Sequence, residues 1–232
     1  MANWFLGRAL AEEAEAENAA WSFLGEGAAF WVTVAVLLLA GVAVYLVTRK
    51  KSSKKSFWTA KTMAVGAMCM ALSSVLSLIK LWSMPMGGSV TPASMLPLLL
   101  FAYCYGVGPG MVLGALYGVM QFLLDGMAWA ALGAIPNLLD YPIAFGLLGL
   151  AGCFRGSKAK MTAGFVLGCF GRFMASFLSG FIFYGQYAPE GVNPVWYSLT
   201  YNGSYMLVEC IICIALGLLV GERLAKELKK VA

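Results

Sequence analysis

The chain contains no histidine and few charged side chains. None of its 232 residues is His, and only 12% are Asp, Glu, Lys or Arg, against about 25% in an ordinary soluble domain. Without His, the sequence lacks the commonest metal ligand and the side chain that most often transfers protons near neutral pH. It also lacks a G-x-S-x-G motif, a glycine-rich phosphate loop after a strand and, within its long apolar segments, a pair of carboxylates at helical spacing. These absences argue against an enzyme, a metal site and a nucleotide site. A basic face with interleaved aromatic residues is missing too, which argues against nucleic acid as a partner.

Apolar residues dominate what is present, at 61% of the chain. A helix that crosses a bilayer needs about 20 mostly apolar residues, and we place seven such spans at 27–48, 58–81, 91–106, 108–125, 132–153, 161–184 and 197–221. The sequence therefore predicts an all-α membrane protein. It divides into an acidic arm (1–26), a first transmembrane helix (27–48), a basic linker (49–57), a six-helix membrane domain (58–225) and a tail (226–232).

The basic residues predict which side of the membrane each loop faces. Cytoplasmic loops carry an excess of Lys and Arg. The segments "RKKSSKK", "FRGSKAK" and "ERLAKELKK" are basic, whereas "WSMPMGGSVT", "DGMAW" and "GQYAPEGVNPVW" contain no Lys or Arg. With the tight turn "YGVGPG" placed inside, the two groups alternate along the seven spans, so we expect the N-terminus outside the cell and the C-terminus in the cytoplasm.

Small residues recur at every fourth position in two spans. Gly110, Gly114 and Gly118 form one series, and Ala67 and Ala71 form another. This spacing lets helix backbones approach closely within lipid. For the glycines we expect packing between helices of the same chain.

Three charged residues lie well inside predicted spans, away from their ends, where a charge costs several kcal/mol and marks a functional candidate. Arg172 and Glu209 lie at similar depths, and the simplest interpretation of both is a buried ion pair. Asp140 lies fourteen residues before Phe154, or about 20 Å above the inner boundary of its helix. No basic residue is predicted at its height, so a cavity open to the outside there would favour a cationic guest.

Polar and aromatic residues from the neighbouring spans are predicted at the same outer depth. They are Tyr141, Ser176, Tyr184, Tyr197 and Asn202. Aromatic rings near a carboxylate suit a flat or cationic organic ligand. For Trp129, Tyr187 and Trp196, the favoured interpretation is an interfacial aromatic belt.

Three segments taken together resemble the thiamin-specific substrate-binding (S) component of energy-coupling factor (ECF) transporters. They are "LLDYPIAFGLLGLAG", "GRFMASFLSGFIFYGQYAPEG" and "YSLTYNGSY", and the likeness covers roughly 58–225. The resemblance implies a six-helix membrane bundle in a prokaryotic plasma membrane, to which the helix at 27–48 is an addition. It implies thiamin as the transported ligand, with no cofactor. The implied partners are a membrane coupling protein and two ATP-binding subunits.

The resemblance also implies roles for individual residues. Asp140, with Tyr141 beside it, matches the family's acidic residue that holds the aminopyrimidine of thiamin, although many relatives carry Glu. Tyr184 matches a stacking aromatic, while Tyr197 and Asn202 match the family's Tyr and Asn. Ser176 stands where the family has a binding histidine, which changes one contact to the thiazolium.

Two further implications concern docking and alternative functions. Ala67 and Ala71 match the face that docks the coupling protein, with packing inside the bundle as the alternative. The predicted function is high-affinity thiamin binding for an ECF-type importer. The alternatives are an S component for a related vitamin or precursor, or an intramembrane enzyme that acts on a lipid-linked substrate with Asp140 and Glu209 as acid and base.

Overall fold

The computed structural model describes residues 59–84, 87–126, 134–189 and 191–231. These residues belong to the predicted membrane domain and tail. The predicted acidic arm (1–26), the predicted first transmembrane helix (27–48) and the predicted basic linker (49–57) lie outside the described residues.

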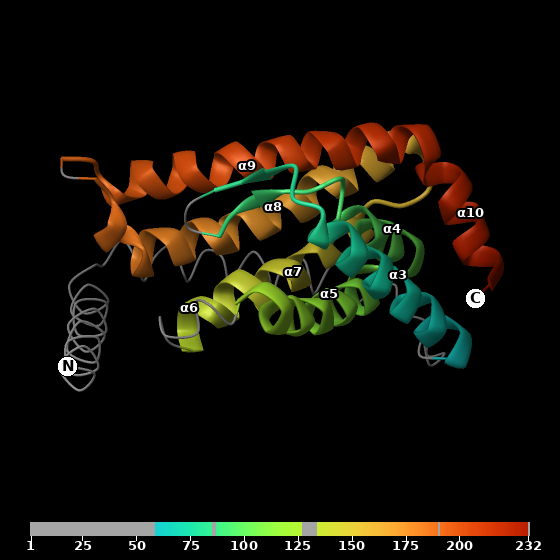
Figure 1. The fold of residues 1–232 in the computed structure, drawn as a ribbon. Helices are drawn as coiled ribbons and strands as arrows, with labels where there is room; N and C mark the ends of the chain where they lie inside the picture. Colours follow the sequence, from blue (N-terminus) through green and yellow to red (C-terminus); the bar gives the residue numbers. More distant parts are fainter. Residues whose placement is uncertain (1–58, 85–86, 127–133, 190, 232) are drawn as a thin grey trace.

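The described chain is a bundle of helices with one short hairpin (Figure 1). The elements, in chain order, are α3 (Ala60–Leu78), β1 (Trp82–Ser83), β2 (Ser89–Val90), α4 (Leu96–Tyr105), α5 (Val107–Gln121), α6 (Ala134–Leu138), α7 (Ala144–Leu147), α8 (Lys158–Phe183), α9 (Pro194–Leu216) and α10 (Glu222–Val231). Turns of π-helix follow α5 (Phe122–Gly126), α6 (Leu139–Ile143) and α9 (Gly217–Gly221), and 3-10 turns follow α7 (Leu148–Cys153) and α8 (Gly185–Tyr187).

Five helical stretches of the described chain are long and apolar enough to cross a membrane. They are Ala60–Leu78, Val107–Gly126, Ile135–Cys153, Lys158–Phe183 and Pro194–Leu228. Many of their outward side chains are large and apolar, as lipid contact requires; Met68 and Leu219, for example, are 70% and 75% exposed. The predicted all-α membrane bundle is therefore confirmed for this part of the chain.

The predicted span at 91–106 is shorter in the structure, because α4 begins only at Leu96. Residues Thr91 to Met95 form a turn instead, in which Ala93 adopts a positive φ of 65°. Ten residues of helix extend about 15 Å, which is half of the hydrocarbon thickness. All residues of α4 from Leu96 to Cys104 are buried, so α4 is the central helix of the bundle.

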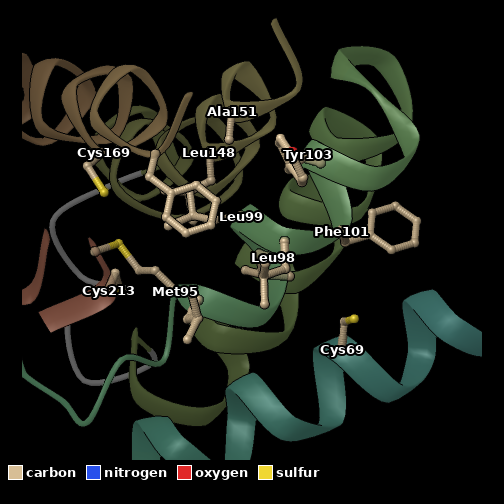
Figure 2. Close-up of a cluster of buried hydrophobic side chains, with 14 of the residues drawn as sticks. Cys69, Met95, Leu98, Leu99, Phe101, Tyr103, Leu148, Ala151, Cys169 and Cys213 are labelled. Atoms are coloured by element: carbon tan, nitrogen blue, oxygen red, sulfur yellow. The ribbon is translucent and has the colours of Figure 1, made fainter. Parts of the chain in front are cut away.

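The core surrounds α4 and joins it to the other helices. Figure 2 shows Leu99 of α4 beside Leu148 and Ala151 from the 3-10 turn after α7, while Phe101 of α4 points away from them. Cys69 of α3 and Cys169 of α8 contribute to the same cluster. Apolar burial around one helix therefore fixes the relative positions of the longer helices.

Polar side chains at the loop ends determine where the long helices begin. Thr59 caps α3 by accepting a 3.2 Å hydrogen bond from the Thr62 amide. Ser157 does the same for α8 at the Lys160 amide, and Asn193 caps α9 ahead of Pro194 at the first helical position. Each cap satisfies an amide that a helix start leaves free.

The glycine series of α5 packs against the helix that contains Asp140. A Cβ on Gly114 would overlap the backbone carbonyl of Phe145, and one on Gly118 would overlap that of Tyr141. The predicted packing between helices of the same chain is confirmed for these glycines. It brings α5 close to the segment from Leu139 to Leu147.

The helix after α9 bends and covers the far end of α4. The bend follows the π-turn at Gly217–Gly221, and α10 then runs across the bundle end in Figure 1. The Tyr105 hydroxyl donates a 2.6 Å hydrogen bond to the Leu228 carbonyl, and Ala225 is buried. The predicted boundary between membrane domain and tail at 225 thus falls inside a packed helix.

Ala67 and Ala71 lie on the outside of α3. Both are exposed, together with Met63, Met68 and Leu72. The buried residues of α3, such as Val65 and Cys69, lie on its other face. The structure therefore gives these two alanines no role in packing within the described bundle.

We predict that Gly114→Val will lower the temperature of unfolding in detergent by roughly 5 °C or more, because the new side chain would strike backbone atoms that cannot move independently. Thermal unfolding of the purified protein measures this. Gly108→Ala on the same helix is the matched control, since nothing lies within 4 Å of an added Cβ there. Equal unfolding temperatures of the two variants would contradict the packing.

Candidate functional site

One cavity of about 130 Å³ lies between α5, the Asp140 helix, α8, α9 and the hairpin. Seventeen residues line it: Gly87, Gly88, Ser89, Gln121, Asp125, Asp140, Tyr141, Phe145, Arg172, Ser176, Gly180, Tyr184, Tyr197, Ser198, Tyr201, Asn202 and Tyr205. The lining combines carboxylates, one guanidinium, hydroxyls and aromatic rings, which is the composition of a site for a polar organic molecule.

A distortion in the helix positions Asp140 at this cavity. Pro142 lies inside the helix, and residues Leu139 to Ile143 form a π-turn. Proline has no amide hydrogen and disrupts regular α-helical bonding, and π-turns within helices are frequent at functional sites. The Ala144 amide bonds to the carbonyls of Leu139 and Tyr141 and so resumes the helix.

Asp140 is held by a hydroxyl and by no cation. The Ser179 hydroxyl of α8 donates a 2.7 Å hydrogen bond to Asp140 Oδ2. No Lys or Arg of the described residues forms an ion pair with Asp140; the ion pairs there join Lys80 to Asp125, Lys158 to Glu222 and Lys230 to Glu227. Arg172 lines the same cavity but forms no ion pair with Asp140, so this carboxylate can accept hydrogen bonds from a ligand or pair with its positive charge.

The predicted ion pair between Arg172 and Glu209 is wrong. Arg172 lines the cavity, and its guanidinium carbon lies 4.1 Å from the centre of the Phe145 ring. Glu209 is instead 1% exposed and accepts hydrogen bonds from Thr91 at 2.5 Å and Ser94 at 2.8 Å. Two hydroxyls thus bind Glu209 in place of Arg172, and the Arg172 side chain lines the cavity instead.

The Arg172 side chain keeps hydrogen-bonding capacity that the protein does not use. Its Nε and Nη1 atoms are buried and have no hydrogen-bond partner among the described residues. The face of Phe145 supplies a cation–π contact in place of a counter-ion. The cavity therefore presents donors from Arg172 as well as the acceptor of Asp140.

The polar residues of α9 bond mainly to one another. The Asn202 amide nitrogen donates to the Ser198 carbonyl at 3.1 Å and to the Ser198 hydroxyl at 3.2 Å. The Tyr205 hydroxyl donates to Asn202 Oδ1 at 3.0 Å. Asn202 is 6% exposed, so its amide is fixed in orientation by α9 itself.

Aromatic rings form much of the remaining wall. Tyr184 ends α8 as its C-cap residue, and Tyr197 lies in the first turn of α9 with its ring 6.0 Å from that of Tyr201. Tyr141 packs edge-on against Phe122, with ring centres 5.4 Å apart. Their faces and edges suit a flat ring system.

The structure brings all six predicted binding residues to this one cavity. Asp140, Tyr141, Ser176, Tyr184, Tyr197 and Asn202 line it, although they come from three separate helices. Whether each of them contacts a ligand stays a prediction. Tyr187, predicted for the aromatic belt, is 47% exposed and is absent from the lining. Trp129, predicted for the same belt, lies outside the described residues.

Sequence reasoning missed several residues of the site. Ser179, which holds Asp140, lies three positions after Ser176 on α8, and helical spacing gives that signal. Tyr205 lies eight positions after Tyr197, which again places both on one side of a helix. The hairpin residues Gly87 to Ser89 gave no signal, because their contact with α9 joins segments far apart in the sequence.

The chain matches a family of known transporters. The model of the family described as "Thiamine transporter protein" matches residues 63–228. The thiamine transporter ThiT of Bacillus subtilis is 39% identical over 145 residues, which cover 56% of this chain and 73% of that protein. ThiT of Lacticaseibacillus paracasei is 33% identical over 134 residues, which cover 52% of this chain and 67% of that protein.

A solved structure, that of ThiT from Listeria monocytogenes, has a similar fold. It matches with a TM-score of 0.62 and 20% identity, over 72% of this chain and 96% of that one. The relatives are named transporters and not enzymes. The fold, the membrane spans and the family model agree: this chain is a multi-pass membrane protein that belongs to the thiamine transporter protein family.

Proposed function

We propose that this chain is the thiamin-binding S component of an ECF-type importer. The observation that carries the proposal is Asp140, a carboxylate without a cationic partner that lines a cavity of aromatic and polar side chains. Thiamin has an aminopyrimidine, which donates two hydrogen bonds to a carboxylate when its ring nitrogen is protonated, and a positively charged thiazolium, which suits aromatic faces. The names of the relatives support the same ligand.

In this proposal Asp140 holds the aminopyrimidine and Tyr184 stacks on a ring of the ligand. Tyr141, Tyr197 and Asn202 complete the wall, and Ser176 occupies the place of the family's histidine. Analogues without hydrogen-bond donors at this position should bind more weakly, because they leave the oxygens of the buried carboxylate unpaired. A related vitamin or precursor that keeps the aminopyrimidine is therefore the competing ligand to test beside thiamin.

The distribution of basic residues supports an outward-facing cavity. Arg155, Lys158 and Lys160 lie before or within the first turn of α8, and the Arg155 guanidinium donates to the Cys104 carbonyl at the end of α4. Tyr184, at the C-terminal end of α8, and Tyr197, at the N-terminal end of α9, lie away from these basic residues. By the positive-inside rule, the basic end with α10 faces the cytoplasm and the tyrosine end faces outward.

Energy for transport would come from other proteins. We propose a membrane coupling protein and two ATP-binding subunits as partners, with Ala67 and Ala71 on α3 as the docking face. Their exposure, beside the exposed apolar side chains of Met68 and Leu72, supports this assignment. Small residues let a partner helix approach closely within lipid.

Asp140→Asn is expected to weaken thiamin binding at least about tenfold, or about 1.4 kcal/mol, because the amide presents a donor where the ligand needs an acceptor. Isothermal titration of the purified protein measures the affinity. Asp140→Glu is the matched control and should retain binding, since it keeps the carboxylate. Unchanged affinity in Asp140→Asn would remove this residue from the site.

Tyr184→Ala is expected to weaken thiamin binding by roughly 1 kcal/mol or more, since a stacked ring contributes about that much beyond its buried area. Tyr184→Phe should bind nearly as well as the unchanged protein, because it keeps the ring. Titrations of both, with Tyr187→Ala as a control outside the cavity, give the comparison. If Tyr184→Ala and Tyr187→Ala bind alike, the stacking role is excluded.

Ala67→Leu combined with Ala71→Leu is expected to block docking while leaving thiamin affinity unchanged, because the added side chains separate two helices and lie away from the cavity. Thiamin uptake by cells and co-purification of the coupling protein measure docking, and titration measures binding. Ala163→Leu on the exposed face of α8 is the matched control. Normal uptake by the double variant would refute the docking face.

A further inference from the structure

Glu209 lies outside the cavity lining; it is the single charged residue of α9 and is 1% exposed. It accepts hydrogen bonds from the hydroxyls of Thr91 and Ser94, which are themselves buried. Burying an ion is costly unless hydrogen bonds compensate it. The arrangement therefore points to a specific task for this carboxylate at the start of α4.

The turn that Glu209 holds is tightly built. The Thr91 hydroxyl accepts a 3.1 Å bond from the Ser94 amide and lies 2.8 Å from the Ser94 hydroxyl. Ala93 takes a positive φ of 65°, and its amide bonds to the Thr91 carbonyl. A conformation that is uncommon outside glycine persists where the surroundings enforce it, and Glu209 bonds to both polar side chains of this turn.

The turn continues directly from the hairpin that forms one wall of the cavity. Strand β2 ends at Val90, and the preceding residues Gly87, Gly88 and Ser89 line the cavity. Figure 1 shows the hairpin lying along α9. A contact that holds Thr91 in place therefore also restrains the cavity wall formed by Gly87, Gly88 and Ser89.

A row of side chains on α9 meets this hairpin and turn. Tyr201, Tyr205 and Glu209 are spaced by four residues, which places neighbours on the same side of a helix. The Gly88 amide donates a 3.2 Å hydrogen bond to the Tyr201 hydroxyl. The Tyr205 ring approaches Gly88 so closely that an added Cβ would come within 2.8 Å of it.

We propose that Glu209 is a positioning residue for ligand binding: through Thr91 and Ser94 it fastens the Gly87–Ser89 wall of the cavity to α9. The ligand-release part of this inference rests on the proposed thiamin site. The tyrosines supply contact at the wall itself, and Glu209 supplies the anchor one turn further along α9. Loss of the anchor frees the wall and speeds ligand release without changing any residue that lines the cavity.

The first experiment measures the rate of thiamin dissociation from the purified full-length protein. Glu209→Met removes the acceptor, and Thr91→Val and Ser94→Ala remove the donors. We expect about tenfold faster release in Glu209→Met, because it leaves buried hydroxyls unpaired. Glu209→Gln keeps an acceptor oxygen and should stay within about threefold of the unchanged protein. Glu222→Gln, a carboxylate change on α10, is the matched control and should release thiamin at the normal rate.

A double-mutant cycle separates this role from general stabilisation. If Glu209 acts through Thr91, then Glu209→Met combined with Thr91→Val should release thiamin no faster than Glu209→Met alone. If the two substitutions instead increase the rate of thiamin release independently, so that their fold-changes multiply in the double variant, the proposal is overturned. Should Glu209→Met fail to fold, the comparison of Thr91→Val and Ser94→Ala with their double variant decides in the same way.

Hydrogen exchange tests the anchor without any ligand. In the ligand-free protein, peptides covering residues 79–95 should exchange faster in Glu209→Met and Thr91→Val, while peptides of α8 stay unchanged. Faster exchange in a protein that does not bind thiamin would support the anchor and refute the proposed ligand. Normal exchange and release in these variants, or exchange that rises equally throughout the protein, would refute the anchor.

Discussion

The structure depends on keeping one carboxylate available inside an apolar helix bundle. Asp140 would be costly in lipid, and an arginine beside it would neutralise it. The fold instead gives it one hydroxyl, from Ser179, and leaves no cation in ion-pair contact within the described chain. Pro142 and its π-turn set the position of this residue, and the close approach of α5 at Gly114 and Gly118 supports the distorted helix from behind.

Asp140 and Glu209 show two solutions to the same physical problem. Glu209 is enclosed and compensated by two hydroxyls of one turn, so it is a fixed part of the fold. Asp140 lines a cavity, where Ser179 donates a hydrogen bond to it and the Ser176 and Tyr184 hydroxyls lie near, so it is accessible to a ligand. Both are carboxylates within long apolar helices. The difference lies in the side of the helix on which each carboxylate lies and in the hydrogen-bond donors that the neighbouring segment provides.

This contrast explains how far the sequence could be used for prediction. The length of the apolar segments predicted the helices, and the spacing by four predicted that Gly110, Gly114 and Gly118 pack against other helices. The six predicted site residues line one cavity because each lies near the same end of its helix. The pairing of Arg172 with Glu209 failed because equal depth says nothing about rotation around the helix axis. The short α4 and the hairpin wall were missed, since both depend on contacts between distant segments, such as Thr91 with Glu209.

Some polar groups of the cavity are already hydrogen-bonded within the protein and others are not. The groups that are not are the ones that a ligand can bind. Asn202 is engaged with Ser198 and Tyr205, so the polar surface of α9 is largely satisfied before any ligand enters. Arg172 retains buried donors without partners among the described residues, and Asp140 retains acceptor capacity. Imperfectly paired polar groups cost affinity, and their pairing on binding restores it. We propose that selectivity resides on the side formed by α8 and the Asp140 turn, while α9 supplies a preorganised aromatic wall whose position its own hydrogen bonds maintain.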